Sequence, residues 1–101
     1  MFSRGNIHRL DRHLQTVRDA AQQEVFLVGG CVRDVLCGWT ENPTDVDSTA
    51  AGDPAQIYAH FQAQAEKYIG LFRTEKYGTM TMIQESDYGN ISYELTPFRE
   101  E

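Results

Sequence analysis

The sequence predicts an α/β domain in which helices pack on a small mixed β-sheet. The apolar run Val25–Val28 leads directly into Gly29-Gly30, as a buried strand does when it leaves a sheet through a tight turn. Near the N-terminus, apolar side chains recur at spacings of three and four, which is typical of an amphipathic helix. These side chains are Ile7, Leu10, Leu14, Val17 and Ala21. Residues 79–84 and 91–96 read as strands on either side of a turn, which predicts a β-hairpin.

Length and composition indicate one small globular domain. The chain has 101 residues, of which 41% are hydrophobic and 11% aromatic. Its formal net charge of −6 argues against strong RNA binding by this chain alone, because phosphate contacts dominate such binding. Cys31 and Cys37 lack zinc-site spacing and would lie on different faces of a helix, so we expect reduced thiols in a cytoplasmic protein. The sequence contains no stretch of membrane-spanning length.

The first half of the chain predicts two helices and two strands. The amphipathic helix covers about Asn6–Gln23, with Asn6 as its N-cap. The strand at about Glu24–Val28 is apolar almost throughout, which is typical of a central strand that is covered on both faces. A short helix over Cys31–Cys37 follows, and the second strand runs from about Thr44 to Ala50.

The second half begins with a well-marked helix. Asp53 is placed as its N-cap and Pro54 at its first helical position, while Ile57 and Phe61 form its buried face. Residues 67–76 fit either a short strand or an irregular packed segment.

The predicted hairpin turns at residues 86–90, and we expect Pro97 to end the pairing of its second strand. Side chains alternate between the two faces of a strand, so this second strand presents two sets of residues. One face carries Ile91, Tyr93 and Leu95, and the other carries Ser92, Glu94 and Thr96. Glu94 is therefore expected on the more polar face.

The glycine turn and the helix after it predict an anion site. Glycine allows close approach of the backbone, and the first N–H groups of a helix are unpaired. Arg33 lies in the first turn of that helix, where its planar fork can reach a phosphate. A glycine pair also fits a plain strand–helix turn with a solvated arginine, and this alternative stays open.

The pair Asp45 and Asp47 predicts a metal site. The two residues share one strand face, about 6.5 Å apart at the strand's rise of about 3.3 Å per residue. Carboxylate oxygens suit hard cations such as Mg²⁺, and two metals are typical of phosphoryl and nucleotidyl transfer. The alternative is a solvated strand end. Glu94 is a candidate for a third carboxylate, with an ordinary exposed strand residue as its alternative.

Four segments in this order resemble a known family. They are LVGGCVRDVLCG at residues 27–38, TDVDSTA at 44–50, YGTMTM at 77–82 and YELTPFR at 93–99. Together they are similar to the signature of class II tRNA nucleotidyltransferases and bacterial poly(A) polymerases. The resemblance implies a head domain of the DNA polymerase β type. It also implies that residues 1–101 are a head without the neck, body and tail domains, and inactive alone.

The resemblance implies a role for each candidate residue. Asp45 and Asp47 would bind two Mg²⁺ ions and act with Glu94 in catalysis. The nucleotide would be bound by Gly29, Gly30, Arg33 and Arg99. The implied reaction is nucleotidyl transfer from CTP or ATP to the 3′ end of tRNA or another RNA, which would be held by domains outside this chain.

Three alternatives remain open at the level of sequence. The motifs do not separate CCA addition from poly(A) addition, because both belong to the same head domain. The chain could also be a non-catalytic magnesium–nucleotide binding module. In a purely structural domain, the two aspartates would simply form part of a turn.

Overall fold

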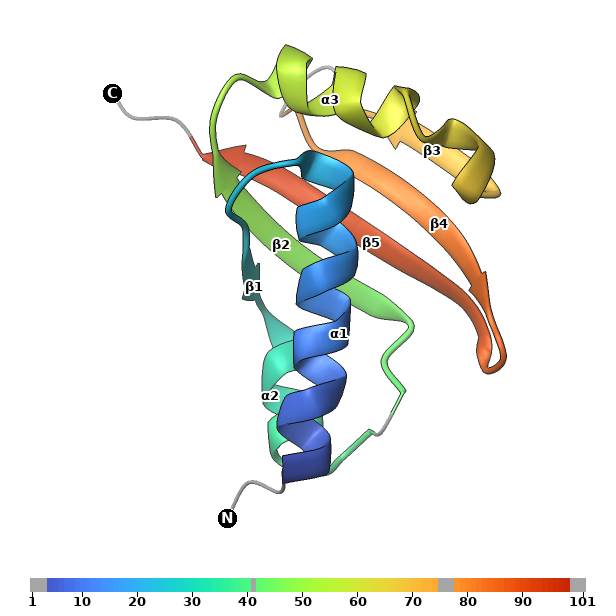
Figure 1. Cartoon of the computed structure of the whole chain (residues 1–101). Coiled ribbons are helices and arrows are strands. Elements are labelled where there is room, and N and C mark those ends of the chain that lie inside the picture. Colours follow the sequence, from blue (N-terminus) through green and yellow to red (C-terminus); the bar gives the residue numbers. More distant parts are fainter. Residues whose placement is uncertain (1–3, 41, 75–77, 99–101) are drawn as a thin grey trace.

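The computed structural model describes residues 4–40, 42–74 and 78–98. A five-stranded mixed sheet is covered by helices on one face, as Figure 1 shows. This architecture confirms the predicted α/β fold class. The elements in chain order are α1 (Arg4–Ala21), β1 (Phe26–Val28), α2 (Gly30–Leu36), β2 (Asp45–Ala51), α3 (Pro54–Gln62), η1 (Ala65–Lys67), β3 (Gly70–Arg73), β4 (Met80–Ser86) and β5 (Gly89–Phe98).

The strands lie in the order β1-β2-β5-β4-β3. Strand β2 is parallel to β5, and the other neighbouring pairs are antiparallel. Strands β4 and β5 form the predicted hairpin, in which Ser86 pairs with Gly89. Strand β3 falls within residues 67–76, so the strand reading of that segment is the correct one.

The prediction that the first strand is central and covered on both faces is wrong. Strand β1 is an edge strand of three residues, and Phe26 and Val28 are 55% and 40% exposed. Only Leu27 packs against the core from within the strand, next to the fully buried Val25. The apolar run predicted two covered faces, but in the described part of the chain the helices cover one face of this sheet.

Helix α1 begins earlier than predicted. Its helical backbone starts at Arg4, so Asn6 lies within the first turn and is not the N-cap. The amphipathic pattern is confirmed in the second half of the helix, where Val17 and Ala21 are buried and Leu14 packs against the core, whereas Ile7 near its start is 53% exposed. None of the helices in the described ranges combines the length and the apolar character needed to cross a membrane.

Helix α3 follows the prediction closely. The Asp53 carboxylate accepts a hydrogen bond from the backbone N–H of Ala55 at 3.1 Å, and Pro54 occupies the first turn. Ile57 and Phe61 are fully buried between this helix and the sheet. The helix is therefore fixed at its start by a local cap and along its length by packing.

Pro97 does not end the pairing of β5 with β2. The pairs Ala50–Pro97 and Ala51–Phe98 continue that ladder, whereas the pairing of β5 with β4 ends at Leu95. The N–H of Ser92 points toward β2, where it donates to the carbonyl of Thr44, so odd-numbered residues of β5 direct their nitrogens toward β4. Pro97 lacks an N–H on the side of β5 that faces β4, and β4 no longer pairs with β5 at this position. No hydrogen bond between strands is therefore lost at Pro97.

Candidate nucleotide and metal site

Strand β2 places two carboxylates on the open face of the sheet. Along this strand Val46, Ser48 and Ala50 are buried in the core, while Asp45 and Asp47 point to the opposite face. The predicted alternation is therefore present. Because alternate residues of one strand serve opposite faces, the core residues hold the strand in place and leave the carboxylates accessible.

Glu94 lies beside this pair. In the parallel ladder between β2 and β5, Asp47 pairs with Glu94 and Asp45 pairs with Ser92. Paired residues share a face, so three carboxylates from two neighbouring strands gather on the open side. On the other side of Glu94, β4 contributes Thr81. The structure thus brings together the three acidic residues that the sequence proposed.

The electrostatics of the cluster show that negative charge is crowded there. Partial desolvation raises the pKa of Glu94, and contact with Asp47 and the charge of Asp45 raise it further. Like charges opposite one another on a sheet destabilise it, and a bound cation would relieve that repulsion.

The glycine turn leaves space for one of these carboxylates. Gly29 has φ +81°, and a Cβ atom there would lie 3.0 Å from Oδ2 of Asp47. The positive φ falls on Gly29 and not on Gly30, which begins α2 with helical geometry. Glycine is therefore required at position 29 both by backbone conformation and by the approach of Asp47.

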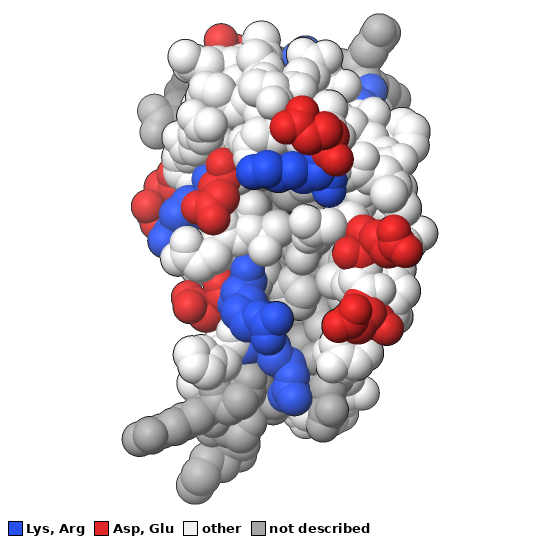
Figure 2. Space-filling view, turned by 45° about the vertical axis from the view of Figure 1, so that its right-hand side comes forward, with Lys and Arg blue, Asp and Glu red and all other residues white. Residues whose placement is uncertain are grey.

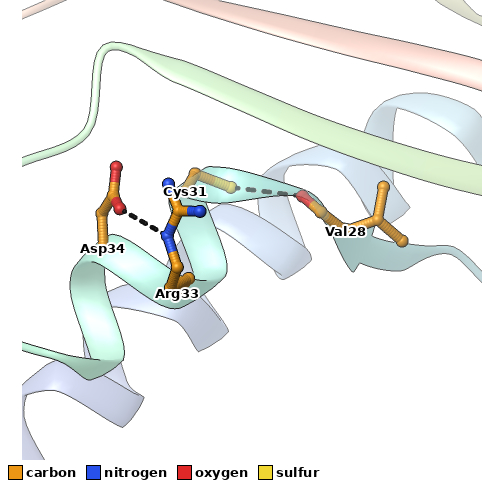
Figure 3. Close-up of polar contacts among 4 residues, drawn as sticks. All are labelled: Val28, Cys31, Arg33 and Asp34. Carbon is orange, nitrogen blue, oxygen red and sulfur yellow. Dashed lines mark hydrogen bonds and ion pairs between the residues drawn. The ribbon is translucent and has the colours of Figure 1, made fainter.

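Arg33 lies over this turn from the first part of α2. Its Nε donates to Oδ1 of Asp34 at 3.1 Å, and a Cβ atom at Gly30 would lie 3.3 Å from its Nη2. Figure 3 shows the ion pair beside the turn. The Arg33 side chain is 64% exposed, so it is accessible to a ligand beside the turn.

Cys31 contacts the same turn through its side chain. Its thiol donates to the backbone carbonyl of Val28 with Sγ and oxygen 3.6 Å apart (Figure 3). Burial raises the pKa of the Cys31 thiol, so the neutral donor is favoured. Cys31 is buried, Cys37 is exposed, and neither forms a disulfide.

Sequence reasoning assigned no role to Trp39, which the structure places beside Arg33. The guanidinium carbon of Arg33 lies 5.7 Å from the centroid of the Trp39 ring. The sequence signal for this contact is the glycine at position 38, since a glycine just after a helix commonly reverses the chain. In the structure Gly38 has a positive φ and reverses the chain at the end of α2. Arg99, the remaining predicted nucleotide contact, lies outside the described residues.

The helix-covered side of the molecule has a different character. A groove of about 600 Å³ lies between α1 and the β4–β5 hairpin, and its lining includes Arg12 on the helix and Asp87 at the hairpin tip. Figure 2 shows Lys and Arg side chains interspersed with acidic ones on the face in view. This face is therefore not uniformly basic, in keeping with the acidic net charge.

The residues present fit a magnesium ion by donor type. Within the described ranges, no group of three or more His, Cys, Asp or Glu side chains is arranged so that it could hold a metal ion. Mg²⁺ in nucleotide enzymes is commonly bound by one or two carboxylates together with substrate phosphates, and does not need a cage made only of protein. Asp45 and Asp47 supply such a pair.

Comparison with known proteins identifies relatives of this chain. Residues 25–101 match the family described as the poly A polymerase head domain. The CCA-adding enzyme of Lactobacillus helveticus (strain DPC 4571) is 36% identical over 88 residues, which make up 87% of this chain and 19% of that protein. The CCA-adding enzyme of Lactobacillus delbrueckii subsp. bulgaricus is 37% identical over 79 residues, or 77% and 17% of the two chains. The chain thus spans about a fifth of the length of the curated relatives it matches.

Solved structures share the fold. The complex of a CCA-adding enzyme with ATP gives a TM-score of 0.63 at 24% identity, covering 92% of this chain and 21% of that one. A tRNA-processing enzyme in its apo form I gives 0.59 at 21% identity, covering 96% and 24%. The family match covers most of the chain and agrees with the motif resemblance, so this chain belongs to the poly A polymerase head domain family.

Proposed function

We propose that this domain carries the catalytic site for nucleotidyl transfer from a nucleoside triphosphate to the 3′ end of an RNA, with CCA addition to tRNA as the reaction. The observation that carries the proposal is the juxtaposition of Asp45, Asp47 and Glu94 on one open face, next to a glycine turn that accommodates Asp47. The family match and the relatives named CCA-adding enzymes support the choice of reaction.

Each residue has a distinct task in this proposal. Asp45 and Asp47 would hold Mg²⁺, and Glu94 adds negative potential beside them. When bound, the metal supplies activation of the RNA 3′-hydroxyl and neutralises charge on the departing pyrophosphate. The backbone at Gly29 and Gly30 permits close approach of phosphate, to which Arg33 presents its remaining donors.

The partners follow from the same site. A nucleoside triphosphate is the substrate, with CTP and ATP the nucleotides of CCA addition, and ATP is the ligand in the solved complex of a similar fold. The tRNA would be held by surfaces beyond this chain, because the net charge of −6 and the mixed charges of Figure 2 do not favour phosphate contacts here. We place residues 1–101 as the head of a larger cytoplasmic enzyme, with Arg99 as a further nucleotide contact.

A non-catalytic magnesium–triphosphate module is the second candidate. The argument that favours it is that the residues we propose for the site would contact only the phosphates and their bound metal, which are common to all nucleoside triphosphates. Transfer of labelled CMP or AMP to tRNA that lacks its terminal CCA, by this chain together with the domains that complete it, would separate the two candidates. Poly(A) addition would appear in the same assay as extension with ATP alone.

Metal binding tests the site directly. Manganese titration followed by NMR should broaden signals around Val46 first, because paramagnetic broadening falls steeply with distance from the ion. The double substitution Asp45→Asn with Asp47→Asn should abolish this effect without unfolding the domain. Asp87→Asn, which removes an exposed carboxylate at the hairpin tip, is the matched control and should change nothing. Broadening that starts at the hairpin, or survives the double substitution, would contradict the assignment.

A further inference from the structure

We propose that Trp39 is a positioning residue for Arg33, holding its guanidinium over the glycine turn so that it is ready to bind the triphosphate. The inference rests on the proposed function, since the phosphates concerned are those of the nucleotide substrate. Its basis is the placement of one exposed tryptophan, which the packing of the domain does not explain.

Two contacts hold Arg33 from different directions. On one side, Oδ1 of Asp34 accepts a hydrogen bond from Nε at 3.1 Å. On the other, the Trp39 ring lies 5.7 Å from the guanidinium carbon, within the range of a cation–π interaction. Nη2 lies near the turn, 3.3 Å from where a Cβ atom of residue 30 would be. The side chain of Arg33 thus has partners that direct it toward the proposed phosphate site.

The position of Trp39 is set by the end of α2 and not by the core. Its side chain is 70% exposed, so hydrophobic burial does not account for its place. Its N–H donates to the carbonyl of Asp34 at 2.8 Å, and the N–H of Gly38 donates to that of Val35 at 3.1 Å. With φ +76° at Gly38, this is the hydrogen-bond pattern of a Schellman motif, which reverses the chain and returns Trp39 toward its own helix.

The arrangement leaves Arg33 free to bind phosphate. Asp34 occupies Nε, and the Nη1 and Nη2 groups keep donors for phosphate oxygens. An arginine held in place before binding loses less rotamer entropy on binding. We call the contact by which Trp39 holds Arg33 in this way a brace, and we expect it to increase affinity.

Calorimetry with magnesium tripolyphosphate tests the inference on the full chain. This ligand has no base or sugar, so stacking of a nucleobase on Trp39 cannot contribute. Trp39→Leu should weaken binding by about three- to fivefold, the worth of an exposed cation–π contact, while Trp39→Phe should stay within about twofold. Tyr88→Leu, which removes an aromatic side chain that is 72% exposed at the hairpin tip, is the matched control and should have no effect.

A double-mutant cycle separates a brace from a direct contact. Arg33→Gln should weaken binding on its own, and adding Trp39→Leu to it should cause no further loss. If Trp39→Leu weakens binding equally in both backgrounds, Trp39 acts independently of Arg33 and the inference is wrong. The inference also fails if Trp39→Leu affects ATP but not tripolyphosphate, because Trp39 would then contact the base.

Spectroscopy tests the contact without relying on affinity. Trp39 is the sole tryptophan of the chain, so ring-current shifts of the Arg33 δ-methylene protons in the ligand-free protein should disappear in Trp39→Leu. Unshifted protons in the unsubstituted chain would overturn the brace. If that chain binds tripolyphosphate and Arg33→Gln weakens binding, but Trp39→Leu does not, only the brace is overturned. If the unsubstituted chain does not bind tripolyphosphate at all, both the brace and the proposed function fail.

Discussion

The two faces of the sheet differ in what their side chains do, although the same strands supply both. On β2, Val46 and Ala50 face the helices and are at most 1% exposed, while Asp45 and Asp47 face the open side. Strand β5 divides in the same way, with Leu95 in the core and Glu94 among the carboxylates. The helix-covered face thus supplies stability, and the open face supplies the candidate chemistry.

This division between the two faces predicts which positions of the domain tolerate amino-acid substitution. A side chain that fills the core cannot be shortened without leaving a cavity, because protein interiors are close-packed. The open face instead carries side chains whose neighbours repel them or leave them exposed. Substitutions on the two faces should therefore separate loss of folding from loss of binding, and three predictions test that separation.

The largest effect is expected in the core. Phe61 is completely buried, so Phe61→Ala should lower the free energy of unfolding by about 3–5 kcal/mol and leave little folded domain. Phe72 lies on the open face opposite Thr81 and is 57% exposed, so Phe72→Ala should cost less than about 1 kcal/mol. Urea denaturation followed by circular dichroism measures both. Equal losses would mean that the open face is packed as tightly as the core.

An intermediate effect is expected where the two faces meet, at the glycine turn. Gly29→Ala forces a side chain into φ +81° and toward Oδ2 of Asp47, so it should cost about 1–2 kcal/mol of stability and weaken metal binding. Gly30→Ala is the matched control, because its φ is helical and the nearest atom is the flexible end of Arg33. We expect it to stay within about 0.5 kcal/mol in the same urea experiment. Similar losses at both positions would show that the conformation of Gly29 is not the constraint.

The smallest effect is expected at Glu94, with a defined dependence on pH. The pKa of Glu94 is raised from the ordinary value of 4.5 by partial desolvation and by Asp47 and Asp45. The folded state therefore holds the proton more tightly than the unfolded state, and it loses stability as the pH rises from about 4.5 through the raised pKa. Glu94→Gln should therefore stabilise the metal-free domain at pH 7 by about 0.2–1 kcal/mol. Below about pH 4.5 both states bind the proton and the gain should vanish.

The control for this last prediction is Glu85→Gln, an exposed substitution in β4 away from the acidic cluster. It should not reproduce the pH-dependent gain of Glu94→Gln. A gain from Glu94→Gln that persists at pH 4, or is matched by Glu85→Gln, would show that repulsion within the cluster is not its cause. Added Mg²⁺ should reduce the gain at pH 7, because a cation offsets the same repulsion.

The features that the sequence alone determined are local ones. The cap of α3 at Asp53 depends on residues within one turn of each other, and the common face of Asp45 and Asp47 depends only on strand alternation. The family motifs are contiguous segments of the chain for the same reason. Where local signals were equivocal, as at Asn6 and the apolar run before Gly29, the predicted boundary or burial was wrong.

Only the tertiary structure decided which distant residues meet. The strand order makes β2 and β5 parallel neighbours, and that register sets Glu94 opposite Asp47, 47 residues away in the chain. The same order leaves β1 at an edge, and the chain reversal at Gly38 sets Trp39 against Arg33. Pairing between distant strands is set by the burial of one sheet face as a whole and by closure of the chain between them, which no local spacing encodes.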